Sequence, residues 1–69
     1  MITLPTVRYG DNGLVVRKIQ AILKTMGYIV NQDGDYGSIT RHCIENLQNA
    51  KGLPVTGDVD AATWEALLL

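Results

Sequence analysis

The chain has 69 residues, of which 46% are hydrophobic and 19% are charged, and its formal net charge is −1. A chain of this length forms one small domain, without room for both a full core and a deep catalytic cleft. The near-neutral charge argues against a nucleic-acid-binding module, because such modules present a basic face. No apolar run approaches the roughly 20 residues that a membrane-spanning helix requires.

One seven-residue phrase occurs three times in the chain. The copies begin at Gly10, Gly34 and Gly57 and share the pattern Gly-Asp-x-(Gly/Asp)-x-x-(Val/Thr). A repeated local sequence predicts a repeated local structure. Glycine allows a tight turn, and aspartate accepts a backbone N–H from the first turn of a helix. We therefore expect three helix starts, each capped by the aspartate of its phrase: Asp11, Asp35 and Asp58.

The first part of the chain is expected to contain an extended lead-in followed by a helix. Pro5 disfavours a helix within residues 1–9. After this segment, apolar residues recur at the i, i+3, i+4 spacing of an amphipathic helix. Gly27 suits the position just after a helix end, and Tyr28 can then fold back onto the last turn. The sequence predicts the first helix near residues 12–26.

The second and third phrases are each followed by a further helical pattern. The second helix is expected near residues 36–51, because Gly52 suits its end and Pro54 prevents its continuation. The third helix is expected near residues 59–68. It is too short to be stable alone, so we expect Trp64 to anchor it by burying its large ring.

These segments predict an all-α fold, a compact three-helix bundle with short loops that forms a single domain over residues 1–69. The apolar face of each helix and the apolar residues after the helix ends should meet in one core. The expected core residues are Val16, Ile19, Leu23, Tyr28, Val30, Ile39, Ile44, Leu47, Leu53, Val55, Trp64 and Leu67.

The residues that could carry chemistry do not form a recognisable catalytic or metal site. Ser38 and His42 are four apart on a helix, but a nucleophile also needs an orienting group and an oxyanion site, and Asp35 is better explained as a cap. The alternating polar residues of 31–35 are spaced as in a calcium loop, yet the Gly and Glu that such a loop requires are missing. Cys43 fits a buried helix face. We expect no catalytic residue, no metal and no cofactor.

Several groups of residues occur in a fixed order along residues 8–68. They are Val16-x-x-Ile19-Gln20-x-x-Leu23, Gly27-Tyr28, Asp33-Gly34-Asp35-Tyr36-Gly37-x-x-Thr40, Ile44-x-x-Leu47-Gln48, Gly52-Leu53, Gly57 and Thr63-Trp64-x-x-Leu67. This series resembles the peptidoglycan-binding domain type 1 of bacterial and phage cell-wall hydrolases. The chain departs from the family at Leu47, where Phe is frequent, and at His42, where small apolar residues are preferred. We expect His42 to face solvent.

The resemblance implies that the chain binds peptidoglycan, through the glycan strand, the stem peptide or both, and performs no reaction itself. It implies a monomer that anchors an associated cell-wall hydrolase in the cell wall, the periplasm or the extracellular space, with neither nucleic acid nor membrane as a partner. The chain shows no signal-peptide pattern, so a fragment or a phage-delivered protein is also considered. A shallow wall-binding site would combine an aromatic ring with polar groups that fix orientation. The candidate ligand contacts are Asp33, Tyr36, Ser38 and Arg41.

These residues also have structural interpretations. Tyr36 could cover the edge of the core, and Arg41 could pair with Glu45 four residues later. Gln20 and Gln48 are expected to bind backbone loops inside the fold rather than the wall. The alternative function is a protein-interaction module of the same fold, in a phage particle, a secretion system or an enzyme prodomain. The single free cysteine and the missing signal-peptide pattern favour this alternative or a phage protein delivered by lysis.

Overall fold

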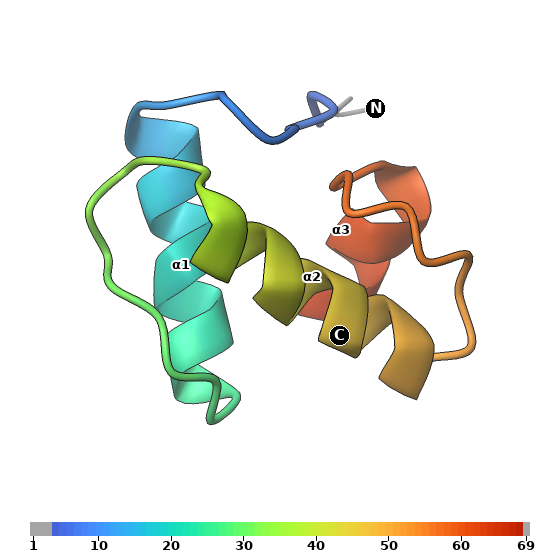
Figure 1. Ribbon diagram of the computed structural model, residues 1–69. Coiled ribbons are helices and arrows are strands. Elements are labelled where there is room, and N and C mark those ends of the chain that lie inside the picture. The colour runs from blue at the N-terminus through green and yellow to red at the C-terminus, as the bar shows by residue number, and fades with distance from the viewer. Residues whose placement is uncertain (1–3, 69) are drawn as a thin grey trace.

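The computed structural model describes residues 4–68, and this part of the chain contains three helices, α1 (Leu14–Thr25), α2 (Ser38–Ala50) and α3 (Ala61–Leu68). In Figure 1, α2 runs diagonally away from α1, and the lead-in passes over the top of α1 towards α3. α3 contacts both other helices. Between residues 4 and 68 the only β-structure consists of isolated bridges. These observations confirm the all-α, three-helix fold. None of the described helices is long and apolar enough to cross a membrane.

The three helices begin at equivalent positions of the repeated phrase. Leu14, Ser38 and Ala61 are the first helical residues, and each follows the initial glycine of its phrase by four positions. The expected helix starts at residues 12, 36 and 59 are therefore two residues too early. The phrase marks a helix start, as predicted, but the helix begins after its fourth residue rather than after its second.

The residue that precedes each helix is the fourth residue of the phrase. Gly13 and Gly37 occupy this position before α1 and α2, where no side chain caps the helix. Asp60 occupies it before α3, and its Oδ1 accepts the N–H of Thr63 at 3.0 Å, which is the geometry of an N-cap. The expected capping aspartates are therefore wrong, because each lies three residues before the first residue of its helix: Asp11, Asp35 and Asp58.

The ends of α1 and α2 have the predicted geometry. After α1, the N–H of Gly27 donates to the Lys24 carbonyl and the N–H of Tyr28 donates to the Leu23 carbonyl, both at 3.0 Å. This pair of bonds is the Schellman motif, which needs a positive φ at its glycine, and Gly27 has φ +98°. Gly52 and the residue after it repeat the arrangement beyond α2. The helix ends are thus set by local sequence.

The core agrees with most of the expected residues. The α2 face that packs inward begins at Thr40 rather than at Ile39, which lies one position round the helix and is 62% exposed. Val55 is also exposed, because it lies in the loop after α2 and points away from the centre. Three residues that were not expected in the core are buried there: Val7, Tyr36 and Val59. The core cluster also contains Cys43 and, of the expected residues, Val16, Ile19, Leu23, Val30, Ile44, Leu47, Trp64 and Leu67, with Tyr28 packed against it.

The lead-in is fixed to the far end of the chain. Val7 and Val59 form an antiparallel bridge, in which each N–H donates to the other residue's carbonyl at 3.1 and 2.7 Å. The indole N–H of Trp64 donates to the Pro5 carbonyl at 2.7 Å. No helix occurs in residues 4–9, and the first part of the expected lead-in, residues 1–3, lies outside the described residues. The lead-in therefore belongs to the packed structure.

Two fully buried glutamines hold the two long loops. The Oε1 atom of Gln20 accepts the N–H of Gly34 at 2.9 Å, and that of Gln48 accepts the N–H of Gly57 at 3.0 Å. Both side chains are 0% exposed. The expectation that these glutamines bind loops inside the fold is confirmed. Because each glutamine binds the glycine that opens a repeated phrase, it fixes the loop that leads into the next helix.

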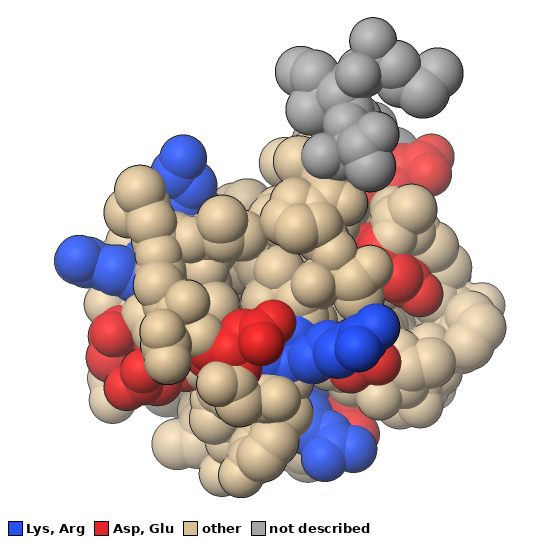
Figure 2. All heavy atoms as spheres, turned by 90° about the horizontal axis from the view of Figure 1, so that it is seen from above, with Lys and Arg blue, Asp and Glu red and all other residues tan. Residues whose placement is uncertain are grey.

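Charged groups of both signs share the surface. Figure 2 views the molecule from above and shows acidic side chains lying between basic ones. Within residues 4–68, both ion pairs lie inside α2, where Glu45 is 3.7 Å from Arg41 and 4.0 Å from His42. The helices of this part are therefore joined by apolar contacts and hydrogen bonds rather than by ion pairs.

Candidate functional site

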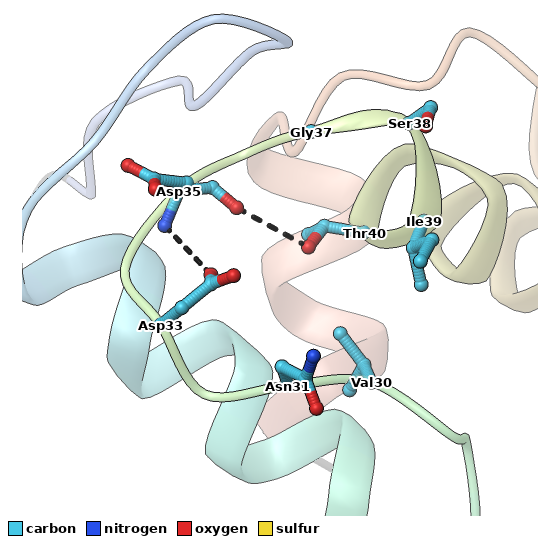
Figure 3. A pocket seen from close by; sticks show the side chains of 8 residues that line it. All are labelled: Val30, Asn31, Asp33, Asp35, Gly37, Ser38, Ile39 and Thr40. Carbon is cyan, nitrogen blue, oxygen red and sulfur yellow. Dashed lines mark hydrogen bonds between the residues drawn. The ribbon is translucent and has the colours of Figure 1, made fainter.

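A shallow hollow lies between the α1–α2 loop and the start of α2 (Figure 3). Its volume is about 200 Å³, which is below the roughly 300–1,000 Å³ of typical small-molecule pockets. A hollow of this size holds one small chemical group of a larger ligand. Its lining residues are Val30, Asn31, Asp33, Asp35, Gly37, Ser38, Ile39 and Thr40. It contains two of the four expected contacts, Asp33 and Ser38.

The carboxylate of Asp33 is held in place by the protein. Its Oδ1 accepts the N–H of Asp35 at 3.0 Å and the side-chain amide of Gln20 at 3.0 Å. These two hydrogen bonds, the one from Asp35 foremost, hold the pKa of the Asp33 carboxyl below its ordinary value. Figure 3 shows that its second oxygen points into the hollow, whereas the Asp35 carboxylate points away. Asp33 thus presents a fixed, ionised hydrogen-bond acceptor.

Ser38 lies at the rim of the hollow as the first residue of α2. It is exposed, and Figure 3 shows its side chain directed outward. The first backbone bond of the helix runs from the N–H of Arg41 to the Gly37 carbonyl at 3.0 Å. The N–H groups of residues 38–40 therefore have no carbonyl partner inside the helix, as at every helix start. The rim offers hydrogen-bond donors, and Asp33 offers an acceptor.

Tyr36 is placed in the core and has no surface to offer a ligand. Its side chain is 2% exposed, and its hydroxyl donates to the Gly57 carbonyl. Burial raises the pKa of the Tyr36 phenol well above its ordinary value, and the nearby Asp58 raises it further. The structure therefore supports the interpretation of Tyr36 as a core residue and corrects the expectation of a direct ligand contact.

This burial predicts a loss of stability in alkali. The phenol has a raised pKa in the folded chain, so its stabilising effect is complete below pH 10.0 and is lost as the pH rises above that value. We expect a loss of about 1.4 kcal/mol per pH unit above pH 10, measured by urea unfolding between pH 9 and 11. Tyr36→Phe should cost about 1–3 kcal/mol at neutral pH and remove this dependence. The same slope in Tyr36→Phe as in the native chain would contradict the assignment, with exposed Tyr9→Phe as the control.

Arg41 lies on the other flank of α2, away from the hollow. Its Nε is 3.7 Å from Glu45 Oε2, which agrees with the interpretation of an i, i+4 pair. Its guanidinium lies 5.8 Å from the centre of the Tyr9 ring, and its stem crosses the backbone of Gly57. Tyr9 is 58% exposed. The four expected contacts are thus divided between a hollow, the core and a separate aromatic and cationic flank.

The side chains considered for catalysis, those of Ser38, His42 and Cys43, are not joined to one another by hydrogen bonds among residues 4–68. His42 is exposed, as expected, and faces Glu45 rather than Ser38. Cys43 is buried, and burial raises the pKa of its thiol, which disfavours the reactive thiolate. No group of three or more His, Cys, Asp or Glu residues within 4–68 is arranged to hold a metal ion.

Some lining residues were missed by sequence reasoning. Ile39 was assigned to the core, and Asn31 was considered only as part of a failed calcium loop. The available signal was position, because Asn31 closely precedes the phrase that begins at Gly34, Ile39 belongs to that phrase, and Gln20 holds the phrase against α1.

Comparisons with known proteins place this geometry in context. Residues 12–67 match a family model described as "Putative peptidoglycan binding domain". The crystal structure of the SleB N-terminal domain has a TM-score of 0.90 and 32% identity, over 99% of this chain and 94% of that one. A Burkholderia AP3 phage endolysin has a TM-score of 0.88 and 35% identity, over 91% of this chain and 24% of that one.

A third solved structure is a peptidoglycan-binding protein from Clostridioides difficile in complex with glutamine hydroxamate. It has a TM-score of 0.91 and 33% identity, over 97% of this chain and 42% of that one. No curated protein matches the chain. The chain therefore spans nearly all of the SleB domain but less than half of the endolysin and of the Clostridioides protein.

Proposed function

This chain belongs to the peptidoglycan-binding domain family, and on that basis we propose that it binds bacterial peptidoglycan without catalysing a reaction. The observation that carries the proposal is the family match over residues 12–67, which include α1, α2 and nearly all of α3. The similarity to a Clostridioides peptidoglycan-binding protein supports it. The place of action is then the cell wall or the space outside the cell.

We further propose that the chain anchors a cell-wall hydrolase, as a monomer. Support comes from the endolysin, of which a region similar to this chain makes up 24%. A weak binding module raises the local concentration of polymer for a linked enzyme, by an amount that the linker sets. Weak binding also permits release, so that the enzyme can move along an insoluble substrate.

We assign the ligand contact to the hollow at Asp33 and Ser38. Asp33 supplies a fixed, ionised acceptor, and the start of α2 supplies donors. Arg41 can add a contact from the flank that it shares with Tyr9. Tyr36 makes no ligand contact in this assignment, because its ring is buried. Its hydroxyl holds the backbone at Gly57.

The proposal predicts that Asp33→Asn weakens retention on purified sacculi. Asparagine keeps an oxygen for the internal bonds from Gln20 and Asp35, but it replaces the oxygen that faces the hollow with a donor. A hydrogen bond to an ionised group is stronger than a neutral one, so we expect a loss of roughly tenfold in cosedimentation affinity. The native chain should be retained and should release no soluble fragments from the sacculi.

Asp60→Asn is the matched control. It removes one negative charge and keeps the capping oxygen that Thr63 requires, but it lies at the start of α3. Equal losses in both variants would show that net charge governs retention, and the hollow would then not be the site. Failure of the native chain to cosediment would overturn peptidoglycan binding itself. A stable complex with a protein partner in its place would establish the interaction module.

A further inference from the structure

Two exposed isoleucines extend the hollow at Asp33 into a longer groove. A second hollow of about 470 Å³ is lined by Ile29, Ser38, Ile39, His42 and Cys43. Ser38 and Ile39 line both hollows, so the two lie side by side, and together they are called the groove. Ile29 is 93% exposed and Ile39 is 62% exposed. The groove therefore has a carboxylate at one end and an aliphatic wall at the other.

The lining of the groove is poorly suited to a sugar ring. Sugars present flat C–H faces, which pack against the faces of large aromatic side chains, and neither hollow is lined by Phe, Tyr or Trp, although the smaller ring of His42 lines the second one. Within residues 4–68, Tyr36 and Trp64 are buried, and Tyr9 lies with Arg41 on the other flank of α2. Tyr28 is partly buried against the core and lines neither hollow. The aliphatic side chains that are present suit methyl groups.

The carboxylate end is suited to a ligand that carries a positive charge. Asp33 forms no ion pair with a Lys, Arg or His side chain among residues 4–68. One of its oxygens is saturated by protein donors, while the other points into the hollow. A glycan strand with acetylated nitrogens has no positive charge to offer. A stem peptide offers amide N–H groups, alanine methyl groups and, on its diamino acid, a free amine.

We propose that the groove binds the stem peptide of peptidoglycan, with the ligand amine on the Asp33 carboxylate and alanine methyl groups on Ile29 and Ile39. This inference rests on the proposed function and names the part of the polymer that is bound. The charge at Asp33 and the aliphatic wall lie at opposite ends of one groove, so they set the direction of the peptide as well as its identity.

The test is a titration of the isotope-labelled chain, followed by amide NMR shifts. Three probes are compared: a stem tetrapeptide with a free side-chain amine, the same peptide with that amine acetylated, and the peptide-free wall disaccharide. We expect the free-amine peptide to shift the amides of residues 29–42. Acetylation of the amine should weaken binding about tenfold, and the disaccharide should leave these amides unchanged.

The variants separate the two ends of the groove. Asp33→Asn should weaken binding of the free-amine peptide about tenfold and binding of the acetylated peptide markedly less. Ile29→Ser and Ile39→Ser should each weaken the binding of both peptides several-fold. Val55→Ser is the control, because Val55 is an exposed aliphatic residue in the loop after α2 and lines neither hollow.

Two results would overturn the inference. One is an equal loss of affinity for both peptides in Asp33→Asn, because the amine of the ligand would then not bind the carboxylate. The other is a disaccharide that shifts the groove amides while the peptides do not. If sacculi still retain the chain in either case, the proposed function stands and only the stem-peptide assignment fails. If sacculi do not retain the native chain, both the proposed function and the stem-peptide assignment are wrong.

Discussion

Replacing Gln48 by leucine is expected to leave the chain largely unfolded at 25 °C. Leucine fills nearly the same space but makes none of the hydrogen bonds. The Oε1 of Gln48 accepts the N–H groups of Thr56 and Gly57 at 3.0 Å, and its Nε2 lies 2.9 Å from the Asp58 carbonyl and 3.0 Å from the Thr63 hydroxyl. Each buried polar group left without a partner costs about 1–3 kcal/mol. A chain of this length has a total stability of roughly 3–10 kcal/mol.

The measurement is urea unfolding followed by circular dichroism and Trp64 fluorescence. Gln32→Leu is the matched control, because Gln32 is exposed, and it should change the free energy of unfolding by less than about 0.5 kcal/mol. A loss of less than about 1 kcal/mol in Gln48→Leu would show that water replaces the glutamine bonds, and that the loop before α3 does not depend on them.

The features that were predictable from sequence are those set by nearby residues. Gly27 and Gly52 end their helices through bonds that span five residues, so the helix ends follow from local sequence. The apolar periodicity of α1 and α2 likewise depends on neighbours within two turns. Gln20 and Gln48 were expected to bind loops inside the fold, and each binds the repeated phrase that follows its own helix. The three-helix fold follows from these elements.

The features that were missed depend on contacts between distant segments. The N–H of Gly10 donates to the Tyr36 carbonyl, and the N–H of Tyr36 donates to the Asp11 carbonyl, both at 2.9 Å. These bonds join the first phrase to the second, so the backbone reaches helical geometry only after its fourth residue. The aspartates that were expected to cap the helices therefore lie in the loops that precede them.

The position of Tyr36 illustrates the same limit. A tyrosine in a polar loop is compatible with a surface ring or with a core ring whose hydroxyl finds a partner. The repeat gave a divided signal, because its third position is the buried Val59 in one copy but the exposed Asn12 in another. Asp33 and Ser38, which were expected to contact the ligand, line a hollow, and that contact stays a prediction, whereas Ile29 was passed over as part of a connector.

Replacing Trp64 by alanine is expected to destabilise the chain by about 3–5 kcal/mol, a large part of its stability. α3 has only eight residues and cannot persist without packing. Its buried side chains are Thr63, Trp64 and Leu67, of which Trp64 is the largest, and the Trp64 indole also binds the Pro5 carbonyl. The substitution therefore removes the anchor of α3 and that of the lead-in together. Thermal unfolding followed by circular dichroism measures the loss.

Trp64→Phe separates these two contributions. Phenylalanine keeps most of the apolar contact but cannot donate to the Pro5 carbonyl, so the cost should fall to about 1–2 kcal/mol. Hydrogen exchange should then accelerate at Val7 and Val59, which form the bridge between the lead-in and the loop before α3. Exchange at Leu23, in the middle of the core, should change only in proportion to global stability. Equal acceleration at all three amides would mean that the lead-in unfolds only with the whole chain, and that the indole bond does not fasten it locally.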